Sequence, residues 1–285
     1  MQIKRVKISL LCIPIVLASV YGGYFLFLAI AYTCALIHEF AHIGVAKSLN
    51  VKIAKIEILP FGICGKLENN LIKNPAHEIL IALAGPLSNL LILALIFLWT
   101  RYMPILNSDI ISYLIHVNIA MMAINLIPSL PLDGGRILKA ILTMALGGIK
   151  AYNIMMRVSR VLIFLILLSA CVILVTTHFN FSLILIGAFM LGNLTNEQRN
   201  ISLISMKEIA YADEKLLKEE PNHVAYLAAH ENVYARRVMR KFTYNRYYMI
   251  DVLGDKNQVL RTLTETQIMN ALLTKSIKIT IGEIF

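Results

Sequence analysis

Charged residues are scarce in this chain of 285 residues: they make up 15% of it, whereas hydrophobic residues make up 58%. A soluble domain has about a quarter charged residues and about half apolar ones. Four apolar runs, near residues 8–37, 79–100, 110–127 and 161–194, reach the roughly 20 residues that span a bilayer. The scarcity of charge therefore excludes an ordinary soluble domain and predicts a polytopic α-helical membrane protein.

Cysteine is also sparse, and its spacing excludes two kinds of structure. Cys12, Cys34, Cys64 and Cys171 form no C-x-x-C pair. Neither a disulfide framework nor a structural zinc knuckle is indicated, and packing as small apolar side chains explains these residues better. The first apolar run also lacks an A-x-A-like cleavage site with polar sequence behind it, so we expect it to stay in the membrane.

The net charge of +10 is explained by membrane topology. Six spans are predicted, near residues 8–20, 24–46, 79–100, 109–127, 159–177 and 180–195. If both termini lie in the cytosol, nearly all basic residues of this part fall on the cytosolic side, and Arg101 is the exception. The positive-inside rule requires this distribution. Direct binding to nucleic acid is therefore not predicted.

Two polar parts of the chain are predicted to contain strands. Residues 51–67 alternate loosely between apolar and charged residues around Pro60 and Gly62, which predicts a β-ribbon of two short strands. Because open strand edges cannot face lipid, the ribbon must lie in protein, at the interface or along water. Beyond the spans the composition becomes polar. We expect a membrane domain at 1–195, a linker helix at 196–221 and a cytosolic α+β module at 222–285.

The predicted module has a clear order of elements. A β-rich run at 247–253, turn residues at 254–257 and a second run at 258–263 predict two strands joined by a turn. Thr264 then precedes a helical segment whose third position is Gln267. This Thr-x-x-Gln pattern is typical of a capping box, in which each side chain bonds to the other residue's backbone N–H.

The segment A-L-I-H-E-F-A-H, residues 35–42, carries the strongest chemical signal. In a helix, His38 and His42 share a face and can bind one metal ion, while Glu39, roughly 100° around the helix, can reach a water molecule beside it. Two histidines and a carboxylate in a membrane span are costly unless they are paired or face water, so they indicate a functional site. The alternative is a cluster of ordinary interfacial charges, and the zinc site is the better interpretation.

A catalytic zinc ion needs a third protein ligand, and the candidate lies far along the sequence. Asp133 follows Pro128 and Pro131 and precedes Gly134 and Gly135, near the cytosolic end of the fourth predicted span. The prolines stop a helix and the glycines allow close approach of the backbone. Taken alone, Asp-Gly-Gly is more often a turn. Together with the two histidines it predicts a ligand.

These motifs, with Gly85-Pro86 and Asn89 on the third span, resemble the site-2 protease family of intramembrane zinc metalloproteases over residues 24 to about 140. The resemblance implies a helical core with the ribbon near the active site. It implies that His38, His42 and Asp133 bind zinc and that Glu39 is the general base. Asn125, in N-x-x-P-x-x-P-x-D-G-G-R, would then position the substrate, and we expect Asn89 to contact the substrate as well.

The tail resembles half of a CBS pair, and a six-span core with one such module resembles the sporulation branch of the family. This implies the membrane-bound precursor pro-sigma-K as substrate and inhibitory sporulation membrane proteins as partners. It also implies a location in the mother-cell membrane around the forespore. A single module implies either a homo-oligomer whose modules pair or a degenerate unit. ATP binding at the module is implied too, and its residues stay open.

Three other functions are compatible with parts of the sequence. A metal transporter regulated by the CBS-like module would use His38, His42 and Asp133 as its transport site, but it has no need for Glu39. The intact Glu39 also argues against a proteolytically inactive scaffold. A site-2 protease with an anti-sigma factor as client is the remaining alternative, and the short tail without a PDZ domain favours pro-sigma-K over it.

Overall fold

A computed structural model of the protein divides the chain into two compact units, residues 1–72 with 76–138 and residues 73–75 with 139–285. The structure describes residues 6–8, 12–51, 53–59, 62–67, 74–102, 108–177, 187–188, 190–192, 194, 223–239, 241–243, 246–274 and 279–284. The predicted linker helix at 196–221 and most of the predicted span at 180–195 lie outside these residues. The predicted domain boundaries therefore stay predictions.

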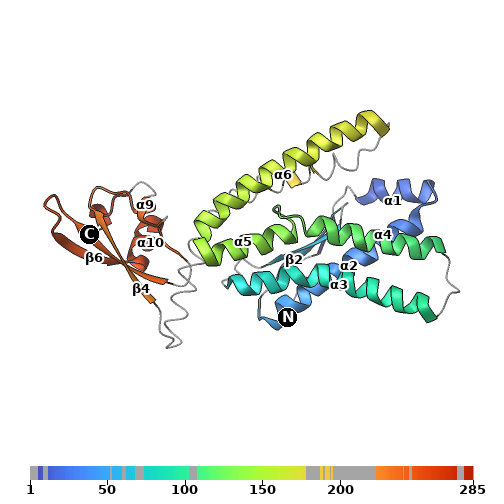
Figure 1. Ribbon diagram of the computed structural model, residues 1–285, viewed down its shortest axis with the longest axis horizontal. Coiled ribbons are helices and arrows are strands. Elements are labelled where there is room, and N and C mark those ends of the chain that lie inside the picture. The colour runs from blue at the N-terminus through green and yellow to red at the C-terminus, as the bar shows by residue number, and fades with distance from the viewer. Residues whose placement is uncertain are drawn as a thin grey trace. The chain divides into compact units, whose positions relative to one another are not determined.

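The first unit is mostly helical and contains one small sheet (Figure 1). Its elements are β1 (Val6–Ile8), α1 (Cys12–Tyr21), α2 (Phe25–Ser48), β2 (Ile53–Leu59), β3 (Gly62–Leu67), α3 (Pro75–Tyr102), α4 (Ser108–Asn125) and the first turns of α5 (Asp133–Leu146). Helix α2 contacts α1, α4 and β3, so it is the central helix of the unit.

The sheet confirms the predicted ribbon and adds one strand to it. β2 and β3 pair antiparallel, and β1 pairs parallel with β2 on the other side. The order is thus β1-β2-β3. The third strand was not predicted because its three residues, Val-Lys-Ile, stand at the start of the first apolar run and have no periodicity of their own.

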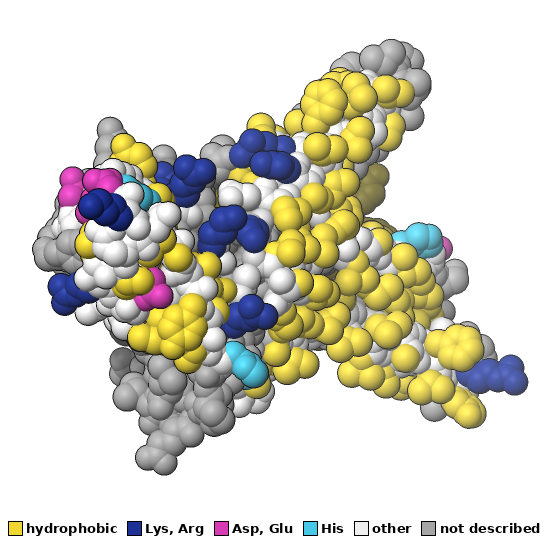
Figure 2. Space-filling model, turned by 60° about the vertical axis from the view of Figure 1, so that its left-hand side comes forward, with side chains coloured by type: hydrophobic (Ala, Val, Ile, Leu, Met, Phe, Trp, Pro, Cys, Tyr) yellow, Lys and Arg dark blue, Asp and Glu magenta, His cyan; other side chains and the backbone are white. Residues whose placement is uncertain are grey.

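Three described helices are long and apolar enough to cross a membrane: Phe25–Ser48, Pro75–Tyr102 and Gly148–Leu174. Figure 2 shows hydrophobic side chains spread over the surface of the helical part. Leu87, Leu91 and Leu95 on α3 are each more than half exposed. So much exposed apolar surface is unfavourable in water and favourable in contact with lipid. The protein is therefore a helical membrane protein.

Two further segments are shorter than the predicted spans. Asp109–Asn125 is an apolar helix of intermediate length. Helix α1 has 10 residues, which at 1.5 Å per residue is about 15 Å, half of the hydrocarbon core. Residue 8, where this span was predicted to begin, lies in the strand Val6–Ile8. The total of six spans stays a prediction.

The second unit contains the rest of α5, the long helix α6 and the C-terminal module. Its further elements are α6 (Gly148–Thr177), β4 (His223–His230), α9 (Ala235–Met239), β5 (Arg246–Leu253), β6 (Val259–Thr264), α10 (Glu265–Thr274) and the 3₁₀ turn η2 (Gly282–Ile284). In the module's sheet β4 is parallel to β5, and β5 is antiparallel to β6. Both strands and the helix predicted at 247–274 are thus present.

The predicted capping box is confirmed at the start of α10. The backbone N–H of Gln267 donates to Thr264 Oγ1 at 3.3 Å, and the backbone N–H of Thr264 donates to Gln267 Oε1 at 3.0 Å. Strand β4 was not predicted. It runs from His223 to His230 and pairs with β5.

The core of the module lies on one face of its sheet. Alternate residues of β5, Tyr248, Ile250 and Val252, are buried, as are Leu263 of β6 and Ile268 of α10. Strands alternate their side chains between two faces, so this pattern places the helices on one side.

We expect Val252→Ala to destabilise the module by about 2 kcal/mol, because the change removes buried methyl groups and leaves a cavity. Val259→Ala is the matched control, since Val259 lies on the neighbouring strand and 56% of it is exposed. Hydrogen–deuterium exchange of the β5 and β6 amides, measured on the full chain in detergent, reports the difference. Equal acceleration of exchange in both variants would contradict the assigned core.

Candidate metal centre

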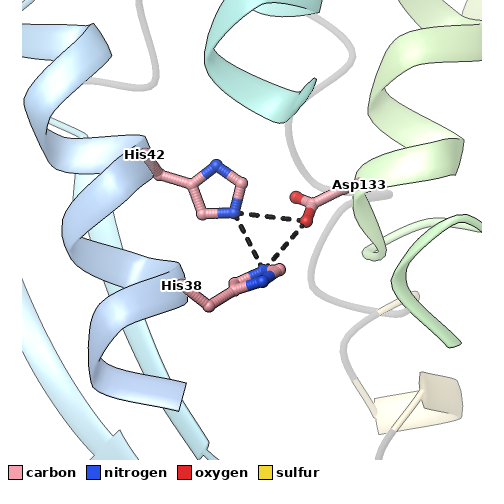
Figure 3. Close-up of side chains that lie close together, drawn as sticks. All are labelled: His38, His42 and Asp133. Atoms are coloured by element: carbon pink, nitrogen blue, oxygen red, sulfur yellow. Dashed lines mark hydrogen bonds and ion pairs between the residues drawn. The ribbon is translucent and has the colours of Figure 1, made fainter. Parts of the chain in front are cut away.

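Helix α2 places two imidazole rings side by side. His38 and His42 are four residues apart on one face of the helix, and each is only 7% exposed. The two Nε2 atoms lie 3.1 Å apart. Figure 3 shows both rings pointing from α2 toward Asp133. The histidine pair predicted from the sequence is therefore assembled.

Asp133 begins α5 and brings the third donor to the pair. Its Oδ2 lies 3.2 Å from Nε2 of His38 and 3.2 Å from Nε2 of His42. The two following glycines make this possible. A Cβ at Gly134 would overlap the backbone of Leu126, and one at Gly135 would overlap the backbone of Ser129. The loop before α5 thus folds tightly against the start of the helix, and only glycine leaves room for it.

The three donor atoms fit one zinc ion. Zinc bonds of about 2.0–2.1 Å in tetrahedral geometry place two ligand atoms roughly 3.3 Å apart. The separations of 3.1 and 3.2 Å among His38, His42 and Asp133 are close to this value. Among the residues that the structure describes, these three form the one group of metal-binding side chains close enough to hold an ion. Three protein ligands leave the fourth position open, as in catalytic zinc sites.

Asp133 carries a negative charge in this setting. Burial alone raises the pKa of the Asp133 carboxyl. Hydrogen bonds with His38 and His42 and the charges of His42 and Arg136 lower this pKa by a larger amount. The net pKa lies well below its ordinary value. Arg136 lies one turn further along α5, with Nη1 3.7 Å from Asp133 Oδ1. The ionised form is the one that binds a metal ion.

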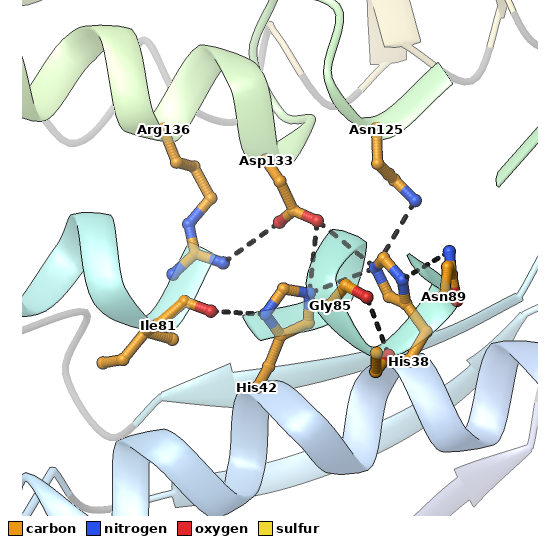
Figure 4. A network of polar contacts seen from close by, with 9 residues as sticks. His38, His42, Ile81, Gly85, Asn89, Asn125, Asp133 and Arg136 are labelled. Atoms are coloured by element: carbon orange, nitrogen blue, oxygen red, sulfur yellow. Dashed lines mark hydrogen bonds and ion pairs between the residues drawn. The ribbon is translucent and has the colours of Figure 1, made fainter. Parts of the chain in front are cut away.

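Helix α3 contacts both histidines on the other side of their rings (Figure 4). His42 Nδ1 lies 2.6 Å from the carbonyl oxygen of Ile81. His38 Nδ1 lies 3.1 Å from the carboxamide of Asn89. Gly85 lies between Ile81 and Asn89 on the helix, and a Cβ at this position would overlap Nε2 of both rings. Helix α3 continues through Pro86 from Pro75 to Tyr102.

The structure brings the predicted site residues together from four helices. Asn125, at the end of α4, has its Nδ2 3.4 Å from His38 Nε2, on the side of the ring where a metal ion would bind. Asn89 is fully buried against Nδ1 of the same ring. Glu39 directly follows His38 on α2 and is half-buried. Its role as base, and the roles of both asparagines toward the substrate, stay predictions.

Three contacts were not predicted from the sequence. Arg136 stands three residues after Asp133 in the Asp-Gly-Gly-Arg motif, and this i, i+3 spacing could have indicated the ion pair. Gly85 provides space for the two rings, and its position beside Pro86 in the sequence does not indicate this. The Ile81 carbonyl belongs to the backbone, so no side-chain pattern could have revealed it.

Gly85→Ala is expected to weaken zinc binding at least about tenfold, the scale of effect seen when supports of metal ligands are altered. The added methyl group would occupy the space of the two Nε2 atoms. Gly44→Ala is the matched control, since Gly44 lies on α2 two residues beyond His42 and an added Cβ there meets nothing within 4 Å. Zinc affinity is measured by competition with a chelator. The same affinity in both variants would show that Gly85 provides no essential space.

The chain is similar to known proteins. The model of peptidase family M50 matches residues 26–107 and 103–169. A zinc metalloprotease of Methanocaldococcus jannaschii is 31% identical over 175 residues, which cover 60% of this chain and 49% of that protein. Stage IV sporulation protein FB of Bacillus subtilis is 25% identical over 239 residues, which cover 83% of this chain and 80% of that protein.

A solved structure agrees with the sequence relatives. The site-2 protease from Methanocaldococcus jannaschii superposes with a TM-score of 0.55 at 27% identity, covering 69% of this chain and 93% of that one. The chain spans about half the length of the first sequence relative. The segments matched by the family model run from α2 into α6 and include His38, His42 and Asp133. The chain therefore belongs to peptidase family M50, the site-2 protease family.

Proposed function

We propose that the chain is an intramembrane zinc metalloprotease that hydrolyses a peptide bond in a membrane protein. One observation carries this proposal: two imidazoles and a carboxylate, buried on apolar helices, hold their donor atoms at the spacing of one zinc ion. Membership of peptidase family M50 supports it. The position of Glu39 beside His38 favours hydrolysis over metal transport, because transport has no need for a base.

Zinc, when bound, lowers the pKa of water and polarises a carbonyl group. His38, His42 and Asp133 would hold the ion and leave one position open. A carboxylate oxygen of Glu39 would accept the proton from the attacking water and deliver it to the nitrogen of the departing amine. Nδ2 of Asn125, close to His38 Nε2, would donate a hydrogen bond to the oxygen of the scissile carbonyl.

The substrate segment must lose its helical structure before it is cut, because the peptide bonds of a helix are shielded and hydrogen-bonded. An extended segment could then add to the sheet by strand pairing. β1 and β3 are its outer strands, with β2 between them, and β3 is the strand that contacts the metal-binding helix α2. We therefore place the substrate along β3. Proline substitutions in β3 that leave cleavage unchanged would remove this part of the proposal.

The proposed client is pro-sigma-K, in the mother-cell membrane around the forespore, with inhibitory sporulation membrane proteins as partners. The similarity to stage IV sporulation protein FB along 83% of this chain supports a role in sporulation. The basic residues of the sequence support cytosolic termini, which would place the C-terminal module on the side of a cytosolic sigma factor. An anti-sigma factor is the alternative client, and parallel cleavage assays with both substrates decide between them.

We propose further that the C-terminal module is a single CBS-like unit that binds ATP and pairs with the module of a second chain. The succession β4, α9, β5, β6, α10 in one small sheet with helices on one face supports the CBS-like assignment. Cleavage rate and oligomeric state are measured with and without ATP. If ATP changes neither, this proposal fails while the protease proposal is unaffected.

Glu39→Gln is expected to lower the rate of cleavage by about 10²–10⁴-fold, the usual contribution of a general base. The wild type and the variant are each co-expressed with tagged pro-sigma-K in a host that lacks both proteins. The amide cannot accept the proton, yet it has the same shape as the carboxylate, so the zinc content should stay unchanged.

Two controls make this experiment decisive. Glu231→Gln makes the same substitution in the C-terminal module and should leave cleavage intact, whereas His38→Ala should lose both zinc and cleavage. Equal membrane abundance of all variants is checked first. Equal cleavage by the wild type and Glu39→Gln would refute the assigned mechanism. If the wild type binds zinc but leaves pro-sigma-K intact, the client is a different protein.

A further inference from the structure

Three residues on one face of α3 lie against the histidine pair. Ile81, Gly85 and Asn89 follow one another at intervals of four residues, so they lie on the same face of the helix. Ile81 contacts His42, Asn89 contacts His38, and Gly85 leaves room for both rings. The residues of α3 thus match those of α2: each histidine has a hydrogen-bond partner at Nδ1, and the glycine between these partners leaves room for both rings.

The contact with Ile81 determines which nitrogen of His42 carries the proton. A carbonyl oxygen only accepts hydrogen bonds, so Nδ1, at 2.6 Å from it, must carry the proton. In the neutral imidazole, which is the form that binds a metal ion, Nδ1 then carries the one N–H, and Nε2 keeps its lone pair. Nε2 is the atom that faces Asp133 and the other ring. His42 is thus held in the tautomer that binds metal through Nε2.

His38 needs the same proton arrangement but has no backbone carbonyl behind it. Its Nε2 also faces Asp133, so its Nδ1 must carry the proton when Nε2 binds a metal ion. The group at Nδ1 is the carboxamide of Asn89, at 3.1 Å. The two ends of a carboxamide have the same shape, and the hydrogen-bond pattern decides which end faces a neighbour.

The surroundings of Asn89 leave its oxygen available for this bond. The side chain is 0% exposed, and Oδ1 has no hydrogen-bond partner among the residues that the structure describes. Nδ2 is placed toward His38 Nδ1. A half turn of the carboxamide brings Oδ1 to Nδ1–H and replaces only the hydrogen bond between the same two residues.

We propose that Asn89 is a positioning residue for the metal centre: its carboxamide oxygen accepts a hydrogen bond from Nδ1–H of His38 and so fixes the ring with Nε2 toward the zinc ion. This inference rests on the proposed zinc site. It assigns Asn89 to the metal ligand instead of to the substrate. It also gives the Gly85-Pro86-x-x-Asn89 segment two functions, clearance at Gly85 and a hydrogen-bond acceptor at Asn89.

The test compares three variants of the full chain in detergent. Asn89→Leu keeps the size of the side chain and removes the acceptor. Asn89→Asp keeps an acceptor oxygen in the same place. Asn118→Leu is the matched control, because Asn118 is equally buried but lies on α4, where its amide donates to the Leu114 carbonyl and Cys34 Sγ. Zinc affinity is measured by chelator competition, and the visible spectrum of bound Co²⁺ reports the ligand geometry.

Asn89→Leu is expected to lower zinc affinity about 10–100-fold, the effect typical of removing a partner that orients a ligand histidine. Asn89→Asp should bind zinc at least as tightly as the wild type, since a carboxylate accepts the same hydrogen bond. Asn118→Leu should match the wild type in affinity and Co²⁺ spectrum.

The failures of the two proposals are distinguishable. If the wild type does not bind zinc, the proposed protease function fails. If the wild type binds zinc and Asn89→Leu has the same affinity, the role of Asn89 is refuted and the protease proposal stands. An equal loss in Asn89→Leu, Asn89→Asp and Asn118→Leu would indicate a general packing defect and would also refute a specific role for Asn89.

Discussion

Two imidazoles and a carboxylate, buried together between apolar helices, impose the constraint around which the first unit is built. A charged group in a medium of low dielectric constant costs several kcal/mol unless it is paired and hydrogen-bonded. Asp133 has both histidines on Oδ2 and Arg136 near Oδ1. The Nδ1 atoms of His42 and His38 contact Ile81 and Asn89, respectively. Removing any one group leaves another buried polar atom without its partner, so the ligands and their supports depend on one another.

Such a centre also requires that helices approach more closely than ordinary side chains permit. Three glycines provide this space. Gly85 lies against the imidazoles, while Gly134 and Gly135 lie against the backbone of the loop before α5. In each case a Cβ would overlap rings or backbone, neither of which can move away easily. Gly44, although it lies close to His42 in sequence, has open space around it. Glycine is therefore required by particular contacts and not by nearness to the motif in sequence.

The sequence predicted what depends on short-range patterns. His38 and His42 share a helix face because of their spacing, and Thr264 with Gln267 forms a capping box for a similar local reason. Contacts between distant segments were less accessible. Asp133 was found because its loop chemistry is unusual, whereas strand β4 contains three alanines and has little β-periodicity. The Ile81 carbonyl has no sequence signal at all. What the sequence lacked was the register of one helix against another.

That register explains why the asparagine stands at position 89. One residue changes the direction of a helical side chain by about 100°. Ser88 turns back to its own helix and donates to the Gly85 carbonyl at 2.7 Å, and Leu90 is 51% exposed on the outer surface. Neither neighbour could reach His38. A hydrogen-bond acceptor for Nδ1 of His38 is thus possible only at position 89. This position lies eight residues after Ile81, whose carbonyl supports His42, and Gly85 lies halfway between them. The helix register of α3, set by packing, thereby determines which nitrogen of each histidine is available to a metal ion.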